Sequence, residues 1–301
     1  MKKIFIAGGG GMLGEAFYHV FKGEYDLIVT DKDVNSEWIS FLDFRDYEQY
    51  RKMVYEFKPD YLFHLGAYTN LEYCEENITD TFTTNTISVE YAVNIANELK
   101  IPILYISTAG IFDGNKNSYD DFDTPNPLGI YARSKFAAER FVIEHANDYL
   151  ICRAGWMMGG GEKKDKKFVN KIIKQILAGS TVLNIVNDKD GTPTYTYDFA
   201  KNIKLLVEKT QFGLFNMVCN GQTSRLEVAN EILHALGLQE LIKIVEVSTD
   251  FFNKEYYAPR PVNERLVNLK LDILGLNIMK DWKVALREYI EKDFKHLKSN
   301  L

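Results

Sequence analysis

Short apolar segments alternate with longer amphipathic segments along the first half of the chain. The apolar runs are rich in Ile, Leu, Val and aromatic residues, and a run without polar alternation predicts a strand buried on both faces. Helix-length amphipathic segments separate most of these runs, and repeated alternation of strand and helix predicts an α/β fold built on a doubly wound parallel sheet. The predicted strands lie at Lys3–Ala7, Leu27–Thr30, Ser40–Leu42, Tyr61–Leu65, Ile103–Ser107 and Leu150–Arg153, and two of the intervening helices at Ile78–Leu99 and Tyr131–Asn147.

The pattern changes after Arg153. Gly159–Gly161 interrupts the chain, and the charged segment Glu162–Lys167 predicts a solvent-exposed connection. We therefore divide the chain into residues 1–155 and a smaller C-terminal lobe, residues 156–301, with parts of residues 193–217 returning to the first domain. Further helices are predicted at Phe168–Ala178, Tyr197–Glu208, Arg225–Leu236 and Lys283–Phe294.

The composition narrows the classes of function. Of 301 residues, 46% are hydrophobic and 26% charged, which is ordinary for a globular protein. The net charge of −6 argues against a nucleic-acid partner, because tracking a phosphate backbone requires a basic stripe. No apolar run approaches the roughly 18 residues of a membrane span. The three cysteines, Cys74, Cys152 and Cys219, have neither metal-ligand spacing nor an even count, so we expect no metal and a reducing, cytoplasmic location.

A glycine-rich segment follows the first predicted strand directly. Gly9, Gly11 and Gly14 fit G-x-G-x-x-G, and Gly8, Gly11 and Gly14 fit G-x-x-G-x-x-G. Both patterns bring a helix N-terminus against a pyrophosphate, which a Cβ atom would keep away. The alternative is a purely structural turn. The order of strand, loop and helix favours a Rossmann-type dinucleotide site, with cofactor contacts from Gly8, Gly11, Met12, Leu13 and Gly14.

Acidic residues end the next two predicted strands. Asp31 follows the second strand, at a position where an acid usually accepts hydrogen bonds from the adenosine ribose. Its charge would repel a 2′-phosphate and favour NADH over NADPH, although Lys32 softens that preference. Asp43, after the third strand, is placed near the adenine edge. The alternative for Asp31 is a simple turn cap.

Tyr131 and Lys135 carry the candidate chemistry. They are four residues apart, so they share one face of a helix. A nearby ammonium is expected to lower the pKa of a phenol, which makes Tyr131 a usable proton donor. The hydroxyls of Ser107 and Thr108 end a buried strand, where a ligand cleft is expected, although Ser107 fits a structural turn better. An exposed helix pair is the alternative for the tyrosine and lysine. His64, within an apolar strand, is predicted to be a hydrogen-bonded core residue.

Together these residues resemble the extended short-chain dehydrogenase/reductase superfamily, over nearly the whole chain. Within it the chain is most similar to the dTDP-4-dehydrorhamnose reductase family. The motifs that distinguish this family lie outside the glycine loop: Ser107–Gly114, Asn187–Thr196 with Asp198–Ala200, and Ala258–Pro261.

The resemblance implies an NAD(P)H-dependent reduction of a nucleotide-linked 4-keto-6-deoxy sugar. Tyr131 would protonate the developing alkoxide, Lys135 would hold the nicotinamide ribose, and Thr108 would bond the reacting oxygen. Residues 1–155 become the dinucleotide-binding domain and residues 156–301 mainly the substrate-binding lobe. Trp156 would lie near the sugar or plug the space between the lobes, and Arg260 would bind the diphosphate or order its loop. By analogy with the family, we expect a homodimer.

One motif departs from the family pattern. The family reads Ser-Thr-Asp-Tyr where this chain reads Ser107, Thr108, Ala109 and Gly110. Without the acid a dehydratase activity is not expected, and the exact sugar is left open. The alternatives are an epimerase or epimerase-reductase, and a dinucleotide-binding regulatory subunit without activity, such as that of methionine adenosyltransferase.

Overall fold

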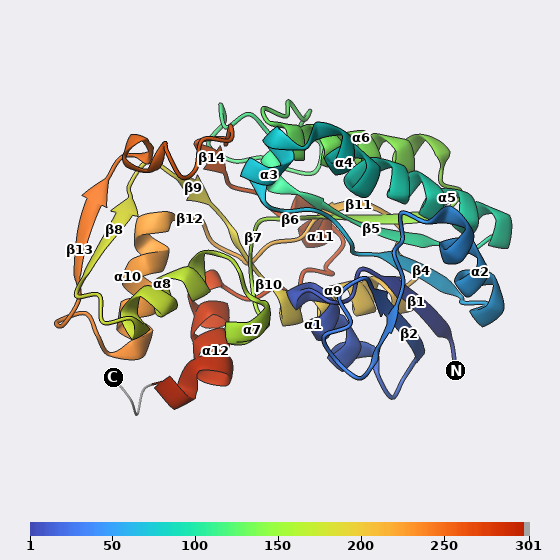
Figure 1. Ribbon diagram of the computed structural model, residues 1–301, viewed down its shortest axis with the longest axis horizontal. Coiled ribbons are helices and arrows are strands. Elements are labelled where there is room, and N and C mark those ends of the chain that lie inside the picture. Colours follow the sequence, from blue (N-terminus) through green and yellow to red (C-terminus); the bar gives the residue numbers. More distant parts are fainter. Residues whose placement is uncertain (298–301) are drawn as a thin grey trace.

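The computed structural model describes residues 1–297 and contains a central sheet of seven parallel strands. The strand order is β11-β6-β5-β4-β1-β2-β3 (Figure 1). Most residues of the inner strands are buried, as continuous apolar runs in a doubly covered sheet require. This confirms the predicted Rossmann-type α/β fold. The strands span β1 Lys3–Ala7, β2 Asp26–Asp31, β3 Ile39–Phe41, β4 Tyr61–His64, β5 Ile103–Thr108, β6 Tyr149–Ala154 and β11 Gly213–Asn216.

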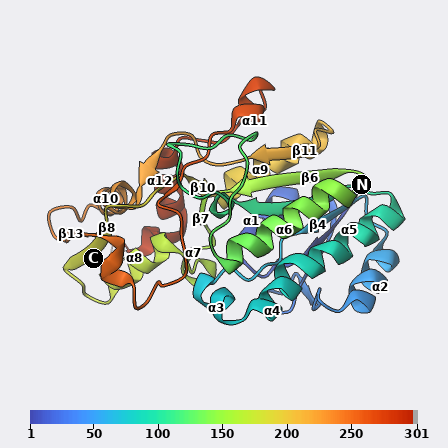
Figure 2. The same ribbon diagram turned by 90° about the horizontal axis from the view of Figure 1, so that it is seen from above.

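Helices cover both faces of the sheet, and β1 shows how the two layers are built. Ile4 and Ile6 belong to one core cluster, with residues of α1 (Met12–Phe21) and α9 (Thr196–Glu208). Phe5 and Ala7 alternate with them and pack in the other cluster. That opposite layer consists of α2, α5 and α6 (Figure 2). These helices span Tyr47–Phe57, Ser88–Leu99 and Ile130–His145.

A smaller group of elements lies beside one end of the sheet (Figure 1). It contains three small sheets, β10-β7, β12-β9-β14 and β13-β8. Their strands span β7 Trp156–Met158, β8 Val182–Val186, β9 Asp190–Gly191, β10 Pro193–Tyr195, β12 Thr223–Ser224, β13 Lys243–Val247 and β14 Asn263–Glu264. The helices of this group span α7 Gly161–Lys164, α8 Phe168–Leu177, α10 Arg225–Leu236 and α12 Trp282–Phe294, whereas α11 (Leu269–Ile273) packs against β11 of the central sheet. Apolar residues of α8, α10 and α12 join the same core cluster as α1 and α9.

The segment predicted as one helix over Ile78–Leu99 differs from a regular helix. A π-helical turn, η1 (Thr83–Ile87), separates α4 (Ile78–Phe82) from α5, after the short α3 (Leu71–Glu76). The wider turn allows Asn85 to accept a hydrogen bond from the Tyr68 backbone N–H at 2.7 Å and to donate to Ser134 Oγ at 3.1 Å. The π turn therefore fixes the loop after β4 to α6. Hydrophobic periodicity does not distinguish such a turn from an α-helix.

The expectation for Glu162–Lys167 is wrong in part. Asp165 is only 1% exposed, because Tyr289 donates a hydrogen bond to its carboxylate from α12. Lys167 turns inward and donates to the backbone oxygen of Thr69 at 3.2 Å. Part of the charged segment Glu162–Lys167 therefore packs against the rest of the protein. Within residues 1–297, no helix combines the length and apolarity that crossing a membrane would require.

Candidate active site

A large cleft opens at the carboxyl ends of the central strands, where open α/β sheets bind their ligands. Its volume is about 1670 Å³, more than one small molecule fills. The glycine loop, the end of β5 and the start of α6 line one side, and segments of the smaller lobe line the other. The cleft brings together the following predicted residues: Gly8, Gly11, Met12, Leu13, Gly14, Asp31, Lys32, Asp43, Thr108, Tyr131, Lys135, Trp156 and Arg260.

The glycine loop lies tightly against the structure at some positions and is open at another. Gly8 has φ +83°, and a Cβ atom there would lie 2.2 Å from the backbone nitrogen of Gly66. A Cβ on Gly14 would lie 2.2 Å from the backbone oxygen of Gly9, so both glycines are required by the turn. A Cβ on Gly11 would meet no atom within 4 Å, because Gly11 faces the cleft. The loop is therefore packed closely at Gly8 and Gly14 and leaves open space at Gly11, on the side that faces the cleft.

Thr108, Tyr131 and Lys135 lie together at the edge of the sheet. Thr108 is the last residue of β5, and its hydroxyl is near enough to Tyr131 to lower the pKa of that phenol. Thr108 Oγ1 also accepts the backbone N–H of Gly110 at 3.1 Å. Tyr131 and Lys135 lie on the first turns of α6, with Lys135 only 4% exposed. Ser107 is part of β5 rather than a turn, and within residues 1–297 its buried hydroxyl has no hydrogen-bond partner.

The titration of this pair differs from the expectation that Lys135 lowers the pKa of Tyr131. Burial raises the pKa of Tyr131 to about 12, although its hydrogen bond to Thr108 lowers it. Burial also lowers the pKa of Lys135 to about 7, against the charge of Glu139. Loss of solvation dominates both groups, because each is more stable in its neutral form away from water. Tyr131 therefore retains its proton throughout the neutral range.

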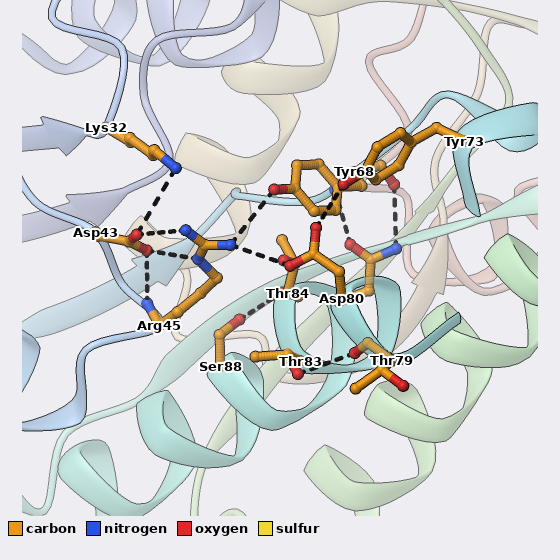
Figure 3. Close-up of polar contacts among 11 residues, drawn as sticks. Lys32, Asp43, Arg45, Tyr68, Tyr73, Thr79, Asp80, Thr83, Thr84 and Ser88 are labelled. Atoms are coloured by element: carbon orange, nitrogen blue, oxygen red, sulfur yellow. Dashed lines mark hydrogen bonds and ion pairs between the residues drawn. The ribbon is translucent and has the colours of Figure 1, made fainter. Parts of the chain in front are cut away.

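Asp31 and Asp43 lie in different surroundings near the glycine loop. The Asp31 carboxylate accepts the backbone N–H groups of Gly10 and Asp33, both at 2.8 Å. Asp43 forms an ion pair with Arg45 at 2.6 Å, and Lys32 lies 4.0 Å away (Figure 3). The hydrogen bond from Arg45 lowers the pKa of Asp43.

Arg45 connects this region to the loop after β4. Its guanidinium contacts Asp80 at 3.2 Å and the Tyr68 hydroxyl at 3.4 Å (Figure 3). Two carboxylates therefore share its charge. Sequence reasoning did not find Arg45, because only the fold brings Asp80 to the end of β3.

The substrate candidates lie on the opposite side of the cleft. Trp156 donates its indole N–H to Glu264, and the Arg225 guanidinium lies 3.6 Å from the centre of the Trp156 ring. Arg260 forms an ion pair with Glu72 at 2.6 Å and donates to the backbone oxygen of Ala258 at 2.9 Å. Both residues predicted from the sequence therefore face the cleft.

Sequence reasoning missed other cleft residues, including Glu264, Arg225 and Lys189. Within residues 1–297, no carboxylate lies within ion-pair distance of Arg225, and burial lowers the pKa of its guanidinium to about 10. Burial also lowers the pKa of Lys189. Lys189 belongs to the Asn187–Thr196 motif, so the sequence contained a pattern that could have identified it. No sequence motif pointed to Arg225.

His64 is the core residue that the sequence predicts. It is 1% exposed, and its ring nitrogens lie 3.3 Å from the Tyr50 hydroxyl and 3.2 Å from the Ser88 hydroxyl. Burial lowers the pKa of His64 to about 3.

Comparison with known proteins supports the class that the fold and site define, the extended short-chain dehydrogenases/reductases. The RmlD substrate binding domain model matches residues 1–294. The chain belongs to this family.

Several relatives illustrate the range of the family. The dTDP-4-dehydrorhamnose reductase of Yersinia enterocolitica is 33% identical, with a TM-score of 0.86 and coverage of 96% of this chain and 99% of that one. The Bacillus anthracis strain Ames dTDP-4-dehydrorhamnose reductase, solved with NADP, is 28% identical, with a TM-score of 0.87 and the same coverage. Methionine adenosyltransferase 2 subunit beta of Danio rerio is 26% identical over 92% of this chain and 86% of that protein.

Proposed function

We propose that the protein reduces the 4-keto group of a nucleotide-linked 4-keto-6-deoxy sugar with NAD(P)H, as its dTDP-4-dehydrorhamnose reductase relatives are named for doing. The observation that carries this proposal is the position of the Thr108 and Tyr131 hydroxyls. Both side chains line the cleft that also contains the glycine loop and Lys135, and the Thr108 hydroxyl is near enough to Tyr131 to lower the pKa of its phenol. Both hydroxyls are available to one substrate oxygen.

The residues present fit a nicotinamide dinucleotide. The open face of Gly11 leaves room for a pyrophosphate, and the unpartnered Ser107 hydroxyl supplies a buried polar group at the edge of the cleft. Gly8, Gly11, Met12, Leu13, Gly14 and Asp31 would hold the adenosine diphosphate half, and Tyr131 and Lys135 the nicotinamide ribose. The bound dinucleotide supplies the hydride that reduces the carbonyl carbon.

The chain itself supplies the proton and holds the oxygen. Tyr131 donates its phenolic proton to the sugar oxygen as negative charge develops there, and Thr108 donates a hydrogen bond to the same oxygen. A phenol with a pKa of about 12 is fully protonated at neutral pH, so the donor is ready before the substrate arrives. The product is the alcohol, and solvent returns the proton to Tyr131.

We propose that NADH is the preferred cofactor. Asp31 lies against the glycine loop, and its charge disfavours a 2′-phosphate there. Carboxylates offset part of the neighbouring positive charge, because Arg45 pairs with both Asp43 and Asp80 and Lys32 lies 4.0 Å from Asp43 (Figure 3).

Basic and aromatic side chains line the side of the cleft where the substrate would bind. Arg225, Lys189 and Arg260 would surround the diphosphate, and Trp156 would border the sugar. Arg225 and Lys189 are stronger candidates than Arg260, because within residues 1–297 neither has a carboxylate within ion-pair distance, whereas Arg260 pairs with Glu72. The division into a dinucleotide-binding domain, residues 1–155, and a substrate lobe, residues 156–301, remains part of this proposal.

The test is the absorbance of NADH with a panel of dTDP-, GDP-, UDP- and CDP-linked 4-keto-6-deoxy sugars. Net oxidation of NADH with formation of the alcohol supports a reductase. Isomerised sugar without net oxidation indicates an epimerase. Tight dinucleotide binding with no turnover of any sugar indicates a regulatory subunit, the second candidate, which the likeness to methionine adenosyltransferase 2 subunit beta favours.

A further inference from the structure

Glu264 places a carboxylate in the cleft from a part of the chain far from the catalytic residues. It is half-buried, at the end of β14, and lines the same cleft as Thr108 and Tyr131. One carboxylate oxygen, Oε2, accepts the indole N–H of Trp156. The other, Oε1, faces Gly110, and the negative charge of Glu264 contributes to the raised pKa of Tyr131.

The fold fixes the direction of this carboxylate through Trp156. β14 pairs with β9 so that Glu264 lies opposite Gly191. A Cβ atom on Gly191 would come within 2.3 Å of the Trp156 ring, so only glycine leaves space for the indole. Arg225 covers the ring at 3.6 Å from its centre. Trp156 is therefore confined, and its N–H holds Glu264 in one orientation.

Oε1 of Glu264 lies beside Gly110, close to the Thr108 hydroxyl. A Cβ atom on Gly110 would lie 3.4 Å from Glu264 Oε1 and 3.5 Å from Thr108 Oγ1. In the family motif an aromatic residue follows the acid at this place, whereas this chain has Ala109 and Gly110. Because residue 110 has no side chain, the Glu264 carboxylate comes next to the Thr108 hydroxyl from β14.

We infer that Glu264 determines sugar specificity by accepting a hydrogen bond from the C3 hydroxyl of the substrate, an inference that rests on the proposed function. When the C4 oxygen is bonded to Thr108 and Tyr131, a substituent of C3 or of C5 enters the space beside Thr108. In a 4-keto-6-deoxy pyranose, C5 carries the ring oxygen and a methyl group, so the only hydroxyl next to C4 is on C3. A carboxylate favours that hydroxyl and disfavours a methyl group, which cannot replace its lost water.

The test compares two nucleotide-linked 4-keto-6-deoxy sugars, one with the C3 hydroxyl and one that is 3-deoxy, in wild type and Glu264→Gln. The amide keeps the shape of the side chain, but its oxygen is needed by Trp156, so its NH2 group faces the sugar. We expect wild type to favour the hydroxylated sugar by about 10- to 100-fold in kcat/KM, and the variant to lose most of that preference. An unchanged ratio would overturn the inference alone. No reduction of either sugar by wild type would overturn the proposed function together with it.

Two further variants keep the test decisive if Glu264→Gln does not fold. Gly110→Ala adds a methyl group at ordinary contact distance from Glu264, so we expect normal folding and NADH binding but a raised KM for the hydroxylated sugar. Trp156→Phe removes the N–H that orients the carboxylate, and we expect it to lose most of the preference for the hydroxylated sugar, as Glu264→Gln does, with a raised KM because the ring also borders the sugar. A preference that survives in both variants would overturn the assignment.

Discussion

The ammonium group of Lys135 lies 4.2 Å from the centre of the Tyr105 ring, and the Tyr105 hydroxyl donates to the backbone oxygen of Lys135 at 2.9 Å. Tyr105, on β5, thereby contacts both the ammonium group and the backbone of Lys135. The cation is stabilised by an aromatic face and by Glu139, yet burial still lowers the pKa of Lys135 to about 7. The free protein therefore carries this charge only in the acidic half of the neutral range.

We expect cofactor affinity to depend on this charge. The protonated lysine donates to the ribose hydroxyls and attracts the phosphates, so the Kd for NADH should rise as the pH increases through about 7. Lys135→Met should bind NADH more weakly, with a Kd that is flat across this range, and should lose turnover. Fluorescence titration of NADH measures both effects. Lys52→Met, at an exposed lysine on α2 that does not line the cleft, is the matched control, and a wild-type Kd independent of pH would contradict the prediction.

Tyr131→Phe keeps the ring and removes the proton donor. We expect it to fold, to bind NADH still and to lose kcat by about a hundredfold or more, as for a positioned general acid. Thr108→Val should lower kcat less, with a small effect on cofactor binding, since it removes one hydrogen bond to the substrate oxygen. Steady-state kinetics and NADH titration separate these outcomes. Near-normal turnover by Tyr131→Phe would refute the mechanism.

Gly11 and Gly14 provide a contrasting pair within one loop. Gly11→Val should leave thermal stability unchanged, because a Cβ there meets no atom, yet weaken NADH binding severely by filling the pyrophosphate space. Gly14→Ala should instead lower the melting temperature, because its Cβ would lie 2.2 Å from a backbone oxygen. Differential scanning calorimetry and NADH titration of both variants check this. Unchanged NADH affinity in folded Gly11→Val would disprove the predicted site.

Cofactor choice tests the role of Asp31. Wild type is expected to have the higher kcat/KM with NADH, and Asp31→Ala should gain relative activity with NADPH because the repulsive carboxylate is removed. The variant also loses the hydrogen bonds to Gly10 and Asp33, so activity with NADH should fall. Kinetics with both cofactors side by side give the ratio. A clear wild-type preference for NADPH would mean that Lys32 outweighs Asp31.

The sequence predicted the sheet, and the grouping of Thr108, Tyr131 and Lys135 in one cleft, better than it predicted the opposite wall of that cleft. Buried strands and the glycine loop have local signatures, because periodicity and turn geometry depend on neighbouring residues. Glu264 and Arg225 have none: each lies in the cleft because β14 pairs with β9 and α10 begins beside Trp156. The raised pKa of Tyr131 was also inaccessible, because it depends on burial rather than on the spacing to Lys135.

His64 should govern part of the acid stability of the protein. The pKa of this buried histidine is lowered to about 3, from the model-peptide value of 6.5 expected in the unfolded chain. The unfolded state therefore binds the additional proton between these values, so the stabilising contribution of the neutral ring is complete above pH 6.5 and is lost as the pH falls toward 3. At about pH 4.5 this loss amounts to roughly 3 kcal/mol of the free energy of unfolding.

His64→Gln retains a polar side chain between Tyr50 and Ser88 but cannot titrate. We expect it to be less stable than wild type at pH 8, where only the altered packing counts, and to lose less stability on acidification. Urea unfolding at pH 8 and at about pH 4.5 gives, for each protein, the free energy of unfolding that is lost on acidification. The other titrating groups contribute equally to both proteins, so the difference between the two losses reports on His64. Parallel losses in wild type and variant would show that His64 keeps a normal pKa, and that the carboxylates alone account for acid unfolding.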